Sequence, residues 1–392
     1  MESAKYGSFQ RTRHKYWFHA ASVGELESLW SIIELLADRE CEIVLSVFSE
    51  SAAMHLQRLA RTLKGKTASV VYAGYSPWEG DWQKALIKLK PHVFITAKYE
   101  AWPELWCSLS ELGIPLVIVS AKARRSLKVA RALCRLLGAR LPRMLLLSQT
   151  EANAKLLHDL FPAAQVLRED DPRWDRVIQR KNQGNSRVKE LEKTFMKFPR
   201  PWGVLGSAWP SDLGFWSKSG KPPVNGTLWI VPHKVDSRSV AEIQILLKEW
   251  GLTPVRTTDP VELKVSDQLC VLVDEMGFLS ELYSIMDWAY VGGGFGSGVH
   301  STIEPAIQGI PIATGPEGLL KFDEIEILRQ ADQLTVLNAP AELTAWLASV
   351  EKEIPELSER WLTQVDSRLG ASVRVLDFID SAIRDTLQAY AK

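Results

Sequence analysis

Residues 16–37 read YWFHAASVGELESLWSIIELLA, and this stretch decides the fold class. Its first five residues, Tyr16 to Ala20, form an almost continuous apolar run, which is typical of a strand buried on both faces. The apolar residues that follow recur at the spacing of one helix face: Leu26, Leu29, Trp30, Ile33, Leu36 and Ala37. A buried strand followed at once by an amphipathic helix is the building unit of parallel α/β sheets.

The same unit recurs along the chain in two series. The first series has apolar runs at residues 16–20, 42–48, 68–73, 92–97, 115–121 and 144–149. The second has them at 202–207, 227–233, 269–274, 288–292, 311–314 and 333–337. Between the series, residues 170–201 are rich in charge and contain Gly and Pro, as segments between domains often do. We therefore predict an α/β protein with two doubly wound, Rossmann-like domains that face each other across a cleft.

The expected domains are residues 1–170 and 171–392. The last segment, residues 371–392, is helix-periodic and contains no Gly or Pro, and it is a candidate for packing back on the N-terminal domain. Ligands of doubly wound sheets bind beyond the carboxyl ends of the strands. We therefore look for functional residues directly after the predicted strands.

The charge of the chain is balanced overall but not along its length. The 392 residues include 47 Lys and Arg and 47 Asp and Glu, which gives no general argument for nucleic-acid binding. Residues 1–160 hold 22 basic and 15 acidic residues, a net charge of +7, so the remainder carries −7. This asymmetry favours an anionic partner for the first half.

Several motif classes are missing from the sequence. The four cysteines form no C-x-x-C pair, which argues against a disulfide framework and a thiolate zinc site and fits a reducing cytoplasm. There is no Asp-x-Asp triplet, no H-E-x-x-H spacing and no G-x-S-x-G elbow, so we expect neither a metal site nor a nucleophilic serine. The polar start, and the lack of about 18 consecutive apolar residues, predict no signal peptide and no membrane-spanning helix.

The motif HAASVGE, residues 19–25, joins the first predicted strand to the first predicted helix. Glu25 is therefore expected near a helix N-terminus at the carboxyl edge of the sheet. A carboxylate in that place can act as a general base toward a substrate hydroxyl. It can also simply complement the positive end of the helix dipole, and the residues alone leave both roles open.

A glycine-rich segment, GGGFGSG at 292–298, follows a predicted strand and precedes a predicted helix, as a phosphate-cradling loop would. It matches neither G-x-G-x-x-G nor a P-loop, so a flexible connection is the alternative. Ser301 and Glu304 have the spacing of a capping box, which competes with a ligand role for Glu304. Met276 and Gly277 are expected to open a helix whose N–H groups could bind a phosphate.

Residues 121–143 contain eight basic residues and no acidic one. As a helix, this segment has a basic face with Arg124, Lys128, Arg131 and Arg135, and an apolar face with Leu127, Ala130, Cys134 and Leu137. A basic amphipathic helix suits an anionic membrane surface or phosphorylated lipid head groups. The alternative is a solvated face over an ordinary core helix, and the single sign of charge favours the interfacial role.

Four motifs taken together resemble the 3-deoxy-D-manno-octulosonic acid (Kdo) transferases of lipopolysaccharide synthesis, which have the GT-B glycosyltransferase fold. They are HAASVGE at 19–25, EAWPEL at 100–105, DEMG at 274–277, and the run from Tyr290 through HSTIEPAIQGIPIATGP at 300–316. The resemblance covers nearly the whole chain. The order and spacing of the motifs are more specific than any one of them.

The resemblance implies a peripheral enzyme on the cytoplasmic face of the bacterial inner membrane. Its reaction moves Kdo from CMP-Kdo to a lipid A precursor with inversion, without a metal and with no cofactor besides the donor. Glu25 matches the family's general base and Arg173 its basic stabilising residue. The family's CMP site maps onto Pro232, His233, Met276, Gly277, Phe278, Ser301, Thr302, Ile303 and Glu304. Candidates for contact with the acceptor or the membrane are Lys98, Glu100, Lys122, Arg124, Arg125, Lys128, Arg131 and Arg135.

Some of these residues depart from the family pattern. Lys98 and Phe278 each stand where the family has Glu, His233 where it has Arg, Arg173 where it has Lys, and Ser301 where it has Asn. Two alternatives to Kdo transfer therefore stay open: a catalytically inactive or regulatory relative, and a GT-B transferase or epimerase that uses another activated sugar. For Kdo transfer itself, the expected partners are a lipid A precursor, a CMP-sugar and an anionic membrane surface, and not nucleic acid.

Overall fold

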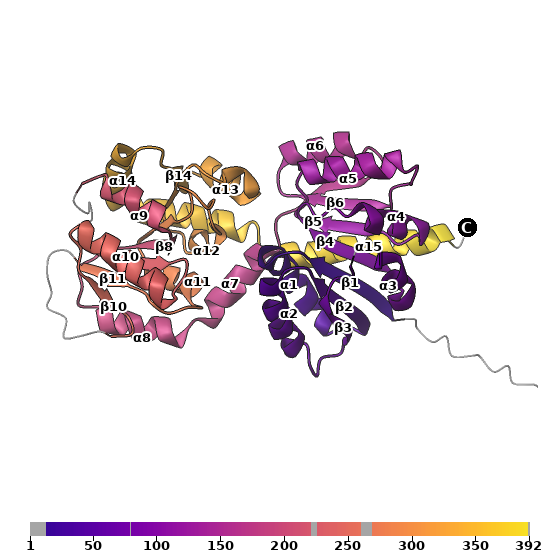
Figure 1. Ribbon diagram of the computed structural model, residues 1–392, viewed down its shortest axis with the longest axis horizontal. Helices are drawn as coiled ribbons and strands as arrows, with labels where there is room; N and C mark the ends of the chain where they lie inside the picture. The colour runs from indigo at the N-terminus through magenta and orange to yellow at the C-terminus, as the bar shows by residue number, and fades with distance from the viewer. Residues whose placement is uncertain (1–12, 79, 221–225, 260–268, 391–392) are drawn as a thin grey trace, which may run out of the picture. The chain divides into compact units, whose positions relative to one another are not determined.

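A computed structural model describes residues 13–78, 80–220, 226–259 and 269–390 (Figure 1). The chain forms two compact units, one that ends at Arg176 and also includes the residues from Leu369 onward, and one from Val177 to Arg368. The division falls within helix α7 (Arg173–Gln183). The first unit therefore extends six residues beyond the boundary expected after residue 170, and it includes the last helix, α15 (Ala371–Tyr390).

The first unit is built on a sheet of seven parallel strands in the order β3-β2-β1-β4-β5-β6-β7. The strands are β1 (His14–Ala20), β2 (Cys41–Val47), β3 (Ser69–Tyr75), β4 (Val93–Ala97), β5 (Leu116–Val119), β6 (Met144–Ser148) and β7 (Gln165–Arg168). The chain crosses from one side of β1 to the other between β3 and β4. The order of the strands therefore reverses between β1 and β4, which is where doubly wound sheets bind their ligands.

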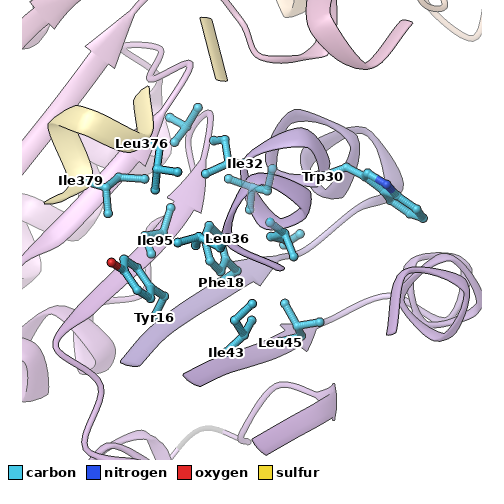
Figure 2. Packing of buried hydrophobic residues seen from close by; sticks show 14 of the residues in the cluster. Tyr16, Phe18, Trp30, Ile32, Leu36, Ile43, Leu45, Ile95, Leu376 and Ile379 are labelled. Carbon is cyan, nitrogen blue, oxygen red and sulfur yellow. The ribbon is translucent and has the colours of Figure 1, made fainter. Parts of the chain in front are cut away.

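Helices cover both faces of this sheet. On one face lie α1 (Val23–Ala37), α2 (Glu50–Thr62) and α15, and on the other α3 (Trp82–Leu89), α4 (Pro103–Glu111), α5 (Arg125–Leu136) and α6 (Glu151–Leu160). Because successive strand residues point to opposite faces, Phe18 packs with the first group and Trp17 with the second. Figure 2 shows Phe18 and Ile95 of the strands against residues of α1 and α15.

Polar contacts attach α15 to the body of the first unit. The Tyr16 hydroxyl donates to Asp380 at 2.8 Å, and Arg39 pairs with the same carboxylate at 2.8 Å. Nearer the start of α15, Arg374 pairs with Glu169 at 2.8 Å. Together with the burial of Leu376 against the sheet, these contacts make the end of the chain part of the first core.

The second unit repeats the plan with seven parallel strands in the order β10-β11-β9-β8-β12-β13-β14. They are β8 (Trp202–Ala208), β9 (Thr227–Pro232), β10 (Pro254–Arg256), β11 (Leu269–Leu272), β12 (Trp288–Val291), β13 (Ile312–Thr314) and β14 (Leu334–Val336). Here the order reverses between β8 and β12.

Two buried clusters enclose the second sheet. One contains residues of α9 (Pro210–Ser217), α10 (Ser237–Glu249) and α14 (Pro340–Asp366). The other contains residues of α8 (Ser186–Phe195), α11 (Leu279–Leu282) and the 3-10 turn Tyr283–Ile285. The short α12 (Ile303–Ala306), the 3-10 turn Leu319–Lys321 and α13 (Asp323–Gln330) complete the unit.

The predicted class, two doubly wound α/β units, is confirmed, and all twelve expected strands are present within a few residues. Two strands were missed, β7 and β10. Both are edge strands, β7 is only partly buried, and β10 has three residues. An apolar run marks a strand buried on both faces, and neither of these strands carries one.

Candidate active site

Glu25 lies at the point of strand-order reversal in the first unit, in the first turn of α1 after β1. It is 3% exposed. Its Oε2 accepts hydrogen bonds from the backbone N–H groups of Ala21 at 2.7 Å and Ser22 at 3.2 Å. Burial raises the pKa of Glu25, while the two N–H groups and nearby Lys98 act in the opposite direction. Both backbone hydrogen bonds are accepted by the same oxygen, Oε2.

Lys98 follows β4, the other strand at the reversal, and faces the segment that carries Glu25. Its Nζ lies 3.6 Å from where a Cβ would stand on Gly24, and the residue is 8% exposed. The backbone of Lys98 has a φ of 64°, in the left-handed region that non-glycine residues rarely adopt. Two backbone hydrogen bonds hold it there, from its N–H to Val119 at 2.7 Å and from Lys122 to its carbonyl at 3.0 Å. Strain of this kind is often kept at functional sites.

Glu100 adds a second carboxylate to the same edge. Burial, and then the charge of Glu25, raise the pKa of Glu100 to about 7, although the indole of Trp102 donates to its Oε2 at 2.8 Å and acts in the other direction. Glu100 therefore changes its charge near neutral pH. Two close carboxylates with raised pKa values are a common arrangement where protons are transferred.

Arg173, the proposed stabilising cation, is held in an ion pair within the first unit. Its Nε donates to Oδ2 of Asp171 at 3.0 Å, and its backbone N–H donates to Oδ1 at 2.9 Å. Burial opposes ionisation of Asp171, but Arg173 and Lys98 outweigh it and hold the pKa of this carboxyl below its ordinary value. The cation is therefore fixed in place by a charged partner that the sequence analysis did not identify.

Only part of the basic segment, residues 121–143, lies near Lys98 at the carboxyl edge of the first sheet. Lys122 is bonded through its backbone to Lys98, and the Arg124 guanidinium lies 5.5 Å from the ring centroid of Tyr99. The remaining basic candidates lie on α5, namely Arg125, Lys128, Arg131 and Arg135.

The apolar side of α5 differs from the expectation. Leu127, Ala130 and Cys134 are buried as predicted, but Leu137 is 71% exposed, because the helix ends at Leu136 and Leu137 is its C-cap. Leu136 is 82% exposed, and Val129 and Leu133 are also exposed. Exposed apolar residues therefore stand among the basic ones.

In the second unit, three aromatic residues lie beyond adjacent strands. Pro232 ends β9 and His233 follows it, stacked on Trp209 at a centroid distance of 4.4 Å and on His300 at 4.5 Å. Neither Trp209 nor His300 was among the predicted site residues, although His300 is the first residue of the motif at 300–316.

A buried carboxylate, Asp212 of α9, holds the glycine-rich loop. It accepts hydrogen bonds from the N–H groups of Gly293 at 2.8 Å and Trp209 at 3.0 Å and from the Tyr290 hydroxyl at 2.9 Å. A Cβ on Gly294 would lie 2.4 Å from the backbone nitrogen of Gly315. The glycines thus permit two loops to pack closely, and the alternative of a flexible connection does not describe this segment.

Two helix starts in the mapped nucleotide site differ from the expectation. The helix after Asp274 begins at Leu279 with Phe278 as its N-cap, so Met276 and Gly277 precede it, and α11 has only four residues. Likewise, α12 begins at Ile303 with Thr302 as its N-cap and no side-chain capping bond, so the predicted capping box of Ser301 is absent.

The residues of the mapped nucleotide site also differ widely in accessibility. Met276 is 76% exposed, whereas Phe278 is buried among the core residues around α8 and α11. Thr302 and Ile303 are both fully buried, and Ser301 and Glu304 are partly buried. Met276, Ser301 and Glu304 are therefore the accessible side chains of these two segments, while Phe278, Thr302 and Ile303 contribute to packing.

Two features are absent from the described part of the chain. None of its helices combines the length and apolarity needed to cross a bilayer. Nor do its His, Cys, Asp and Glu side chains form a group of three suited to a metal ion.

Comparison with known proteins gives consistent matches. Residues 2–175 match the family model described as 3-deoxy-D-manno-octulosonic-acid transferase (kdotransferase). The chain is 26% identical over 360 residues to the 3-deoxy-D-manno-octulosonic acid transferase of Aquifex aeolicus, covering 88% of this chain and 90% of that one. It is 25% identical over 310 residues to the enzyme of the same name from Chlamydia muridarum, covering 76% and 70%.

A solved structure agrees with the fold. UDP-GlcNAc 2-epimerase from Neisseria meningitidis, bound to UDP-GlcNAc, superposes with a TM-score of 0.64 at 12% identity, covering 94% of this chain and 100% of that one. At that identity the match concerns the fold alone, and it confirms the two-domain GT-B class expected from the sequence.

Proposed function

We propose, starting from the chain's membership of the Kdo transferase family, that this glycosyltransferase moves Kdo from CMP-Kdo to a hydroxyl of a lipid A precursor, with inversion and without a metal. The observation that carries the proposal is the state of Glu25, a buried carboxylate with a raised pKa, fixed by backbone N–H groups at the carboxyl edge of the first sheet.

Glu25 would act as the general base. The acceptor hydroxyl transfers its proton to the carboxylate as its oxygen bonds to the anomeric carbon of Kdo. The bond from that carbon to the phosphate oxygen breaks, and its electron pair leaves with CMP. Because attack and departure occur on opposite faces of the carbon, the configuration inverts. A raised pKa makes Glu25 a stronger base than an exposed glutamate, and the hydrogen bonds to Oε2 fix its direction.

Cationic side chains at the same edge would hold the anionic parts of the substrates. Arg173 is preorganised by Asp171, so little rearrangement is needed when negative charge develops on the leaving phosphate. In the second unit, we propose that the nucleotide binds beside Pro232, His233, Met276, Gly277 and the segment 301–304. The four-residue α11 is too short to contribute a large helix dipole, so any contribution from Met276 and Gly277 comes from local N–H groups.

We further propose that α5 docks the enzyme on an anionic membrane, in keeping with a lipid acceptor at the cytoplasmic face of the inner membrane. The support is the mixture of exposed cations, such as Arg125, Lys128 and Arg135, with exposed Leu136 and Leu137. Apolar side chains enter the interface while basic ones meet anionic head groups. Attachment through charge weakens as salt screens it.

The decisive test is transfer by purified protein with a lipid A precursor as acceptor and CMP-Kdo generated in situ. Glu25→Gln should abolish product formation while the variant still folds and binds CMP. Glu40→Gln is a matched control, because Glu40 is exposed and lies outside the site. Full activity of Glu25→Gln would remove the assigned role of this residue.

Two observations favour the second candidate, a relative without this activity. Phe278, where the family has Glu, is buried in the core, and Lys98, where the family has a stabilising Glu, brings a positive charge to the site. A screen of activated sugars separates the cases. Product from another donor would indicate a different transferase or an epimerase, and no product from any donor by a folded, CMP-binding protein would indicate an inactive relative.

A further inference from the structure

Three rings meet at the reversal of strand order in the second unit. Trp209 follows β8, His233 follows β9 and His300 lies in the segment after β12, and these strands are neighbours in the sheet. The planes of Trp209 and His300 are inclined by only 4°, with centroids 6.3 Å apart. His233 stacks on both rings, so it lies over the junction between them. All three residues are partly exposed.

The contact between Trp209 and His300 determines where the imidazole proton lies. Trp209 Nε1 and His300 Nε2 are 3.1 Å apart. An indole N–H can only donate a hydrogen bond, so His300 Nε2 must accept it. An imidazole nitrogen that accepts carries no proton, and the proton of neutral His300 is therefore on Nδ1. Protonating Nε2 would set two N–H groups against each other.

The surroundings of His300 also oppose a positive charge. Burial, then stacked His233 and nearby Lys321, lower the pKa of His300 to about 4. Burial and Lys234 likewise lower the pKa of His233. The buried carboxylate of α9, Asp212, already accepts hydrogen bonds from two backbone N–H groups and the Tyr290 hydroxyl.

We propose that Trp209 is a positioning residue that keeps His300 in the neutral tautomer with its proton on Nδ1, and that this cluster binds the pyrimidine nucleoside monophosphate of the donor. The identity of the ligand rests on the proposed function, whereas the tautomer does not. Doubly wound sheets bind ligands at this point of reversal, and partly exposed flat rings suit a planar base. The Nδ1–H group supplies a fixed donor that remains the same across the physiological pH range.

The tautomer is measured directly on the unmodified protein. With ¹⁵N-labelled histidine, long-range proton–nitrogen correlation distinguishes protonated from unprotonated ring nitrogens for each of the seven histidines, and His300→Gln assigns the signals of His300. We expect His300 to carry its proton on Nδ1 and not to titrate between pH 5.5 and 8. A proton on Nε2, or titration near pH 6.5, would overturn the inference without any variant of Trp209.

Trp209→Phe keeps an aromatic ring and removes the donor. In this variant His300 should populate both tautomers. The affinity of the Trp209→Phe protein for CMP at pH 7, measured by calorimetry, should fall about tenfold. This is the effect expected for one lost hydrogen bond to a polar or charged ligand. Trp78→Phe is the matched control, since Trp78 is 81% exposed and lies in the first unit. Unchanged affinity and an unchanged tautomer in Trp209→Phe would refute the positioning role.

The outcomes also separate this inference from the proposed function. If CMP binds and depends on Trp209 but Kdo is not transferred, the proposed reaction fails and the inference stands. If the unmodified protein does not bind CMP at millimolar concentration, the assignment of this cluster to a nucleotide fails, whatever the tautomer of His300.

Discussion

Replacing Glu100 by glutamine should stabilise the protein, and should do so only above mildly acidic pH. The ordinary pKa of a glutamate is 4.5, and in the folded chain burial and the charge of Glu25 raise that of Glu100 to about 7. The folded state therefore binds the proton more tightly than the unfolded state does. Below about pH 4.5 Glu100 is protonated in both states and has no effect, whereas above about pH 7 it is ionised in both and destabilises the fold.

The size of this effect follows from the difference between the two pKa values. A separation of about 2.5 pKa units corresponds to about 3 kcal/mol of stability, lost as the pH rises from about 4.5 to about 7. At pH 5 less than about 1 kcal/mol of this has been lost. Since glutamine carries no charge, the advantage of Glu100→Gln over the unmodified protein should grow by about 2 to 3 kcal/mol between pH 5 and pH 8.5.

Urea unfolding at pH 5 and pH 8.5 measures this difference. Because the chain has two compact units, the unfolding transition of the first unit must be identified. The substitution Ile95→Val identifies it, since Ile95 is a core residue of that unit and its replacement lowers the stability of that unit. Glu111→Gln is the matched control, since Glu111 is exposed. If the free energy of unfolding of Glu100→Gln exceeds that of the unmodified protein by the same amount at pH 5 and at pH 8.5, the reasoning is refuted.

Three further predictions concern other parts of the molecule. Lys98→Met should raise the pKa of Glu25 further, because a nearby positive charge is lost; ¹³C titration of labelled glutamate carboxyls measures this, and an unchanged Glu25 would contradict it. Gly294→Ala should lower the unfolding temperature, with a cost of about 1–3 kcal/mol, because its Cβ would lie 2.4 Å from a backbone nitrogen; calorimetry giving an unchanged temperature would disprove this. Replacing Leu136 and Leu137 with serine should weaken co-sedimentation with anionic vesicles, most visibly at high salt; binding equal to that of the unmodified protein would exclude them from the interface.

The sequence predicts the fold well where burial is complete. Trp17 and Phe18 of β1 are buried on opposite faces of the sheet, so residues 16–20 form an almost continuous apolar run that is recognisable in the sequence. Edge strand β7 has exposed residues at both ends and only partly buried residues between them, so its sequence need not be apolar. The position of Glu25 in the first turn of α1, directly after the first strand, could also be predicted, because strand and helix are both recognisable in the sequence.

The partners of the site residues could not be predicted in the same way. Lys98 faces the first turn of α1 and has a left-handed backbone directly after β4, and no local sequence pattern at that position requires this conformation. Trp209 meets His300 across 91 residues, and Asp212 binds Gly293 across 81. Such contacts depend on strand order, which a single sequence does not reveal.

The two units differ in the electrostatic character of the residues that lie where the strand order reverses. In the first, the segments after β1 and β4 bring Glu25 and Lys98 together, with Glu100 close to Glu25; the pKa of Glu25 is raised, and that of Glu100 is raised to about 7. In the second, the segments after β8 and β12 bring together Trp209 and His300, which stay neutral. Proton transfer requires groups whose charge can change, whereas a binding surface benefits from groups whose charge does not. This contrast supports assigning the proton-transfer step to the first unit and nucleotide recognition to the second.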